Sequence, residues 1–134
     1  MKTIISPQEA VKRVTSGHLS LLKGLDAHDF THVFDGAEEV ILLTFFQNEQ
    51  VSLATVIEEN EAEIREHADK AKAAMLQLVC GKGQDLSMDD ITVMKTVENL
   101  FPKNTDFSWD VEHTDSTDYM LQIDLYVITI DQLF

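Results

Sequence analysis

Apolar residues follow two different periods along this chain, and the periods predict alternating strands and helices. Val40–Phe46 and Met75–Cys80 are nearly continuous apolar runs, which is typical of strands buried on both faces. After each run come a polar turn and a segment in which apolar residues recur every three or four positions, the period of an amphipathic helix. The order strand, turn, helix therefore occurs twice, over residues 40–64 and 75–101, as a shared architecture without clear sequence identity.

Start and stop signals mark the second helix. Gly81 supplies the backbone freedom that a sharp exit from the strand requires. Ser87 is a residue type that is preferred at the N-cap of a helix. Asp90, three residues later, completes an aspartate version of the capping box. Pro102 ends the helix because proline cannot donate the next backbone hydrogen bond. These signals predict a helix over 88–101.

The first part of the chain predicts one or two further helices. Ser6, Pro7 and Glu9 form a complete helix start, with an N-cap serine, a proline in the first turn and a glutamate three residues after the cap. Asp26 resembles a second N-cap. We therefore interpret residues 1–36 as an N-terminal helical segment.

The last part of the chain alternates apolar and polar residues, the pattern of strands. The alternation predicts strands over 107–113 and 119–128, joined by a polar loop as an antiparallel hairpin. The complete order is strand–helix–strand–helix–strand–strand. We predict an α+β fold, a two-layer sandwich with a four-stranded mixed sheet over residues 37–130, within a single domain that spans 1–134.

Charge narrows the classes of partner. The 134 residues include 24 Asp and Glu but only 10 Lys and Arg, so the formal net charge is −14. Such a chain repels the phosphates of nucleic acids and anionic membrane surfaces, and we expect neither as a partner. The charge favours solubility, or a decoy role in which the chain binds a basic protein.

Cysteine usage and hydropathy point to one compartment. Cys80 is the only cysteine, which excludes an internal disulfide and fits a reducing environment. The sequence contains neither a secretory leader pattern nor an apolar run of the roughly 18 residues that a membrane span needs. We expect a cytoplasmic protein.

One histidine pair could bind a metal. His28 and His32 are four residues apart and would share one face of a helix, with Asp29 beside the first, similar to the His-Glu-x-x-His arrangement of zinc peptidases. A metal-dependent hydrolase is one reading of this motif. The alternative is two exposed histidines with no metal, and short motifs of this kind often match by chance.

Two other features have a structural reading and a functional one. Cys80 ends an apolar strand, where a nucleophile could lie, but no histidine is tied to it by spacing and a buried, inert cysteine fits equally well. Trp109 and Phe107 could stack on bases, but the acids around them favour packing in the core or at a subunit interface.

The segment Gly83–Asp90 resembles a motif of the FtsZ/tubulin superfamily. It reads Gly-Gln-Asp-Leu-Ser-Met-Asp-Asp, similar to the Gly-x-Asp-Leu-(Ser/Thr)-x-Asp-Glu segment between a strand and a helix of the C-terminal domain in FtsZ. The final strand around Leu121–Ile128 also resembles the family's last strand. The resemblance covers about residues 25–128 and implies a freestanding domain similar to the FtsZ C-terminal domain.

A second segment resembles the loop with which FtsZ acts on its neighbour. Residues 24–33 are similar to the family's Gly-Leu-x-Asn-x-Asp-Phe-x-Asp-Val, and Asp29 and Phe30 match it. Ala27 and His32 depart from it, and His32 replaces an acid that would polarise the attacking water. No phosphate-binding glycine loop occurs in these residues, so we expect no GTP and no other cofactor.

The resemblance implies a non-enzymatic protein-interaction module in a bacterial cell-division or cytoskeletal setting. Such a module would bind FtsZ-like filaments or associate with itself as an oligomer. The expected interaction face is the loop at 24–33, with these residues on it: Asp26, His28, Asp29, Phe30 and His32. The metal-dependent hydrolase and the acidic decoy are the alternatives.

Overall fold

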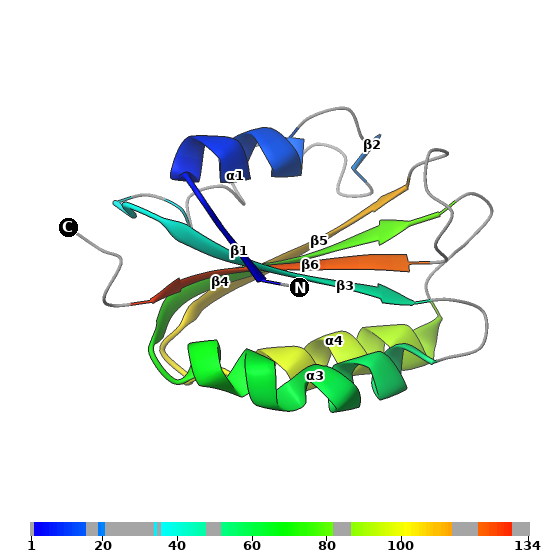
Figure 1. Cartoon of the computed structure of the whole chain (residues 1–134). Coiled ribbons are helices and arrows are strands. Elements are labelled where there is room, and N and C mark those ends of the chain that lie inside the picture. Colours follow the sequence, from blue (N-terminus) through cyan, green and yellow to red (C-terminus); the bar gives the residue numbers. More distant parts are fainter. Residues whose placement is uncertain are drawn as a thin grey trace.

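Six strands form one mixed sheet within the described part of the chain, and helices lie on both of its faces (Figure 1). The computed structural model describes residues 2–15, 19–20, 34, 36–47, 52–81, 87–113 and 121–129. In chain order the elements are β1 (Lys2–Ile5), α1 (Pro7–Thr15), β2 (Leu19–Ser20), β3 (Val40–Gln47), α3 (Leu53–Ala68), β4 (Ala71–Cys80), α4 (Met88–Glu98), β5 (Asp106–His113) and β6 (Leu121–Thr129).

The strand order across the sheet is β1-β3-β6-β4-β5-β2. Only β4 and β5 pair in parallel, and α4 joins them as a crossover. All other neighbours are antiparallel, so β3 and β4 point the same way with β6 between them. β1 and β2 are short strands at the two edges.

The main core lies between the sheet and the helices α3 and α4, which lie next to each other on one face (Figure 1). Alternate residues of the central strands point into it, and Leu43, Leu76 and Leu125 are at most 1% exposed. Ile64 of α3 and Val97 of α4 meet them. Burying one such side chain contributes about 1.5–3 kcal/mol, so this layer supplies most of the folding energy.

A smaller core lies on the opposite face, under α1. Ala10 of α1 and Phe34 pack there against Leu42, Met75 and Tyr126 of the sheet. The rings of Phe34 and Tyr126 meet edge to face, with their centroids 5.5 Å apart. The α+β class and the helix layer on a mixed sheet are confirmed, and α1 adds partial cover on the second face.

Both predicted helix starts that lie in the described residues are confirmed. The backbone N–H of Glu9 donates to Ser6 Oγ at 3.0 Å. The backbone N–H of Asp90 donates to Ser87 Oγ at 3.1 Å, and the Ser87 N–H donates to Asp90 Oδ2 at 3.0 Å, which completes the capping box. The predicted N-cap at Asp26 lies outside the described residues.

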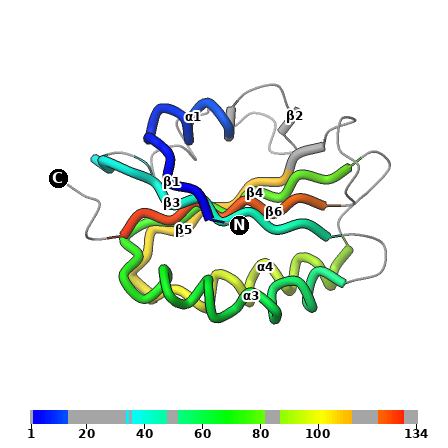
Figure 2. The backbone as a smooth tube through the Cα atoms, viewed as in Figure 1, coloured from blue at the N-terminus to red at the C-terminus, as the bar shows by residue number. Residues whose placement is uncertain are grey.

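The predicted hairpin of the last two strands is wrong. β6 pairs with β3 and β4, whereas β5 pairs with β4 on its other side (Figure 2). The reason is visible in the burial of the two strands. Tyr126, Val127 and Ile128 are consecutive and all at most 1% exposed, which requires a strand with both faces covered. β5 is half-buried at several positions and lies towards the edge.

The predicted strand number and one boundary also need correction. The four expected strands are β3 to β6. β1 and β2 extend the sheet to six, and both lie within the segment 1–36 that we predicted to be helical, where only α1 is a described α-helix. β1 has only four residues and is mostly exposed. A strand of this kind does not need the long apolar run by which a buried strand is predicted. The strand predicted over Met75–Cys80 begins earlier, at Ala71, and α3 before it ends at Ala68.

Candidate interaction site

The interaction face expected from the sequence cannot be placed in this fold. Asp26, His28, Asp29, Phe30 and His32 all lie outside the described residues, and so does the proposed metal pair His28 and His32. In the described parts of the chain, no group of three or more His, Cys, Asp or Glu side chains is arranged to hold a metal ion. The hydrolase reading therefore gains no support from the described residues.

A different surface, between the outer side of α4 and the strand β5, combines exposed apolar side chains with a hollow shape. We call it the α4–β5 groove. Trp109 of β5 is 45% exposed, although its neighbour two residues back, Phe107, packs against the main core. Exposed tryptophans are uncommon because they bury more apolar area than other side chains when covered.

Two hollows follow one another along this groove and share Glu98 as a lining residue. The larger, of about 410 Å³, lies at the C-terminal end of α4. Its lining residues are Glu98, Asn99, Phe101, Pro102, Lys103, Thr105 and Phe107. The smaller, of about 90 Å³, lies beside Trp109. Its other lining residues are Ile91, Met94, Lys95 and Glu98.

Backbone hydrogen bonds hold the walls of the larger hollow. After α4 ends, the N–H of Phe101 donates to the Glu98 carbonyl at 3.1 Å, and the N–H of Thr105 donates to the Pro102 carbonyl at 3.0 Å. The rings of Phe101 and Phe107 stack in a tilted arrangement with centroids 5.3 Å apart. These contacts fix the hollow before any ligand arrives, which lowers the entropy cost of binding.

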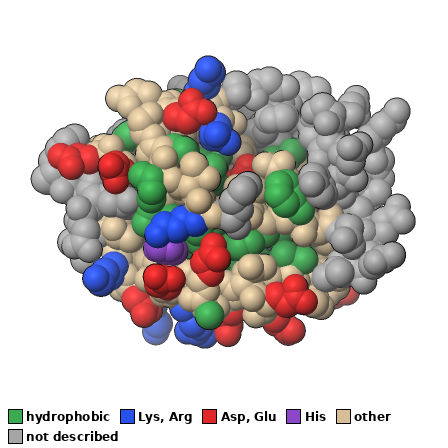
Figure 3. Space-filling model, viewed as in Figure 1, with side chains coloured by type: hydrophobic (Ala, Val, Ile, Leu, Met, Phe, Trp, Pro, Cys, Tyr) green, Lys and Arg blue, Asp and Glu red, His purple; other side chains and the backbone are tan. Residues whose placement is uncertain are grey.

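The charges that line the groove are mixed, whereas the chain as a whole is strongly acidic. Lys95 and Lys103 each line one hollow, and Glu98 lines both. The neighbouring helix α3 presents a row of acidic side chains to solvent, and acidic groups are prominent over that helix in Figure 3. With a net charge of −14, the chain as a whole attracts positively charged partners.

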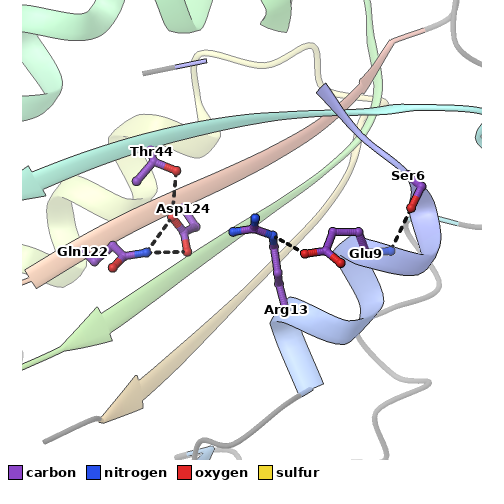
Figure 4. A network of polar contacts seen from close by, with 6 residues as sticks. All are labelled: Ser6, Glu9, Arg13, Thr44, Gln122 and Asp124. Carbon is purple, nitrogen blue, oxygen red and sulfur yellow. Dashed lines mark hydrogen bonds and ion pairs between the residues drawn. The ribbon is translucent and has the colours of Figure 1, made fainter. Parts of the chain in front are cut away.

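A second polar feature lies on the opposite face of the sheet. Thr44, Asp124, Gln77 and Asp110 occupy matching positions on β3, β6, β4 and β5 and form a row across the sheet. Asp124 accepts hydrogen bonds from Thr44 Oγ1 at 3.1 Å and from Gln122 Nε2 at 3.0 Å (Figure 4). The alternation in the last two strands indicates only that Asp110 and Asp124 oppose the apolar side chains, yet Asp110 is 0% exposed.

Other residues noted in the sequence have structural places. Cys80 is a free thiol, 1% exposed, at the end of β4.

The sequence carries one signal of the groove, the apolar residues Ile91 and Met94 of α4, which line a hollow together with Trp109. Using this signal requires the position of β5 near the sheet edge, which the sequence pattern does not give.

Comparisons with known proteins place the fold. The chain superposes on an empty FtsZ dimer structure from M. jannaschii with a TM-score of 0.62, over 90% of this chain and 35% of that one, at 13% identity. The fold is FtsZ-like. CetZ from Methanosaeta thermophila gives a TM-score of 0.51 at 17% identity, over 81% of this chain and 32% of CetZ.

These likenesses have limits that matter for function. The chain spans only about a third of the length of either FtsZ or CetZ. Neither a protein-family model nor a curated protein matches the sequence. The hairpin predicted from the alternation is absent, and the chain nevertheless superposes on the FtsZ structure. No helix in the described residues is long and apolar enough to cross a membrane.

Proposed function

We propose that this chain is a non-catalytic protein-interaction module that binds an FtsZ-like protein or a second copy of itself. The observation that carries the proposal is the α4–β5 groove, where a 45% exposed tryptophan borders two preformed hollows. Large aromatic side chains beside pockets are the residues that contribute most to protein–protein binding. The FtsZ-like fold supports the choice of partner class, because the M. jannaschii structure is a dimer of FtsZ.

A co-sedimentation experiment tests this function. The purified chain is mixed with an FtsZ protein from the same cell under conditions in which FtsZ assembles, and self-association is measured in parallel by analytical ultracentrifugation. We expect the chain either to enter the FtsZ pellet or change its amount, or to sediment as an oligomer. The proposal fails if the chain stays monomeric and leaves FtsZ assembly unchanged.

A matched pair of variants shows whether the groove is responsible. Trp109→Ala removes the exposed ring of the groove, whereas Ile4→Ala removes a side chain of similar exposure, 47%, at the opposite edge of the sheet. We expect Trp109→Ala to weaken association by about 2 kcal/mol, near thirtyfold, as for an interface anchor. Ile4→Ala should leave it unchanged. The predicted face at 24–33 is tested separately by Asp29→Ala, and an effect of that variant alone would move the interface there.

A further inference from the structure

We infer that the α4–β5 groove receives an extended segment of a basic partner protein, which pairs with β5 as an added strand and places two apolar side chains, two residues apart, in the two hollows. This inference rests on the proposed interaction function and specifies the chemistry and conformation of the partner.

The spacing of the hollows matches the repeat of a strand. Phe107 lines the larger hollow and Trp109 the smaller, and these residues are two positions apart on β5. Side chains two apart on a strand point to the same face and are separated by about 6.6 Å. A segment that pairs with β5 would therefore present its own residues i and i+2 to the same two hollows.

The outer edge of β5 is open over this stretch in the described parts of the chain. β5 pairs with β4 along its whole length on one side, from Asp106 to His113. On the other side the only described strand is β2, which pairs with Glu112 and His113 alone. No described strand lies against the edge at Phe107 and Trp109. Backbone groups at such an edge can hydrogen-bond an incoming strand.

Charge decides between the candidate occupants. A second copy would bring another net charge of −14 to the interface, and a nucleic acid would bring its phosphates, so long-range repulsion makes either a weaker occupant of the groove than a basic segment. A segment with lysine or arginine beside its apolar residues is attracted instead. Lys95 and Lys103 each line one hollow, so the attraction comes from the net charge of the whole chain and from Glu98, which lines both hollows. Glu98 lies where a basic residue of the segment would form an ion pair, and the Trp109 ring offers a face for a cation.

The experiment uses short peptides and the fluorescence of Trp109, the only tryptophan in the chain. The first peptide is acetyl-Lys-Thr-Leu-Thr-Leu-Thr-Lys-amide, which reads the same in both directions and so fits a parallel or an antiparallel pairing. The second, acetyl-Lys-Thr-Thr-Leu-Leu-Thr-Lys-amide, has the same composition but adjacent leucines. The third replaces both lysines of the first with glutamate.

We expect the first peptide to shift the Trp109 emission to shorter wavelength as the ring is covered. The second should bind about tenfold more weakly, because one leucine then points away from the hollows. The third should also bind about tenfold more weakly at low salt, and the difference should shrink towards about 0.5 M NaCl. A Glu98→Gln variant should narrow the gap between the lysine and glutamate peptides without loss of fold.

Specific outcomes overturn the inference. It is wrong if the first peptide fails to bind at millimolar concentration, if both leucine spacings bind equally, or if the glutamate peptide binds best. Competition separates this inference from the proposed function. If Trp109→Ala abolishes association with FtsZ but the first peptide does not compete for that association, the groove is an interface of another kind. If Trp109→Ala instead dissociates a homodimer, the occupant is a second copy, and the basic segment is excluded.

Discussion

The two faces of the sheet are buried in different ways. On the α3/α4 face, two amphipathic helices cover the strands with a large apolar core, and His67 of α3 is also buried. On the α1 face, a small apolar cluster adjoins a row of buried polar groups, Thr44, Asp124, Gln77 and Asp110. The α3/α4 face therefore contributes more apolar burial to the stability of the fold, whereas the α1 face buries polar groups at some cost in stability. Mutations on each face should therefore differ in size and in sign.

The largest effect is expected on the α3/α4 face. Leu76→Ala removes a side chain that is 1% exposed in the main core, and it should lower the free energy of unfolding by about 3 kcal/mol through lost burial and a residual cavity. Urea denaturation measures this change. Ile4→Ala, an exposed control, should alter stability by less than about 0.5 kcal/mol. Equal effects of the two variants would mean that this face is not the main core.

A smaller loss is expected in the polar row. Asp124→Ala removes the carboxylate that accepts hydrogen bonds from Thr44 and Gln122, so both donors lose this acceptor on a partly covered face. The free energy of unfolding should fall by about 2 kcal/mol. Thr44→Val, which removes one donor and keeps the shape, should cost about 1 kcal/mol or less. Thermal unfolding followed by circular dichroism measures both. If Asp124→Ala leaves the unfolding temperature unchanged, the polar row contributes nothing to stability.

The next change has the opposite sign. Gln77 is 2% exposed, and its Nε2 finds no hydrogen-bond partner among the described residues. Replacing it with leucine removes a buried donor and retains the volume, so Gln77→Leu should raise the free energy of unfolding by about 1 kcal/mol. The matched variant Leu78→Gln places the same amide on the α3/α4 face and should destabilise strongly. A loss of stability in Gln77→Leu would indicate that the amide binds a group not seen here.

The smallest effect depends on pH and concerns His67 of α3. Burial and the nearby positive charge of Lys2 lower the pKa of His67 from its usual 6.5, against the opposing pull of Glu66 and Glu63. The folded chain therefore prefers neutral His67, and the unfolded chain binds the proton first as the pH falls. This contribution to stability is complete above about pH 6.5 and is lost as the pH drops through that value towards the lowered pKa.

Unfolding curves at several pH values check this expectation. Because many carboxylates also titrate in acid, the readout is the difference between the wild-type chain and His67→Gln. We expect the wild type to lose stability relative to His67→Gln as the pH falls from about 7.5 to about 5.5. If the two chains follow parallel curves, protonation of His67 is not linked to folding.

Local structure follows directly from the amino-acid sequence of this protein. The apolar runs of β3 and β4, the periods of α3 and α4, and the caps at Ser6 and Ser87 all appear in the fold, although α4 ends at Glu98 and not at the predicted Phe101. These features depend on residues within one or two turns of each other, so periodicity and side-chain chemistry are enough to define them.

Which strands are neighbours, and which side of β5 lacks a described partner strand along most of its length, follows from the packing of the whole sheet. β6 inserts between β3 and β4 because it can be buried on both faces, and this choice leaves β5 beside the groove. It also buries Asp110 and Asp124, although each lies in an alternating pattern that does not distinguish a covered face from a solvated one. Strand order depends on competition among all strands for the central positions, and no local period encodes the outcome of that competition.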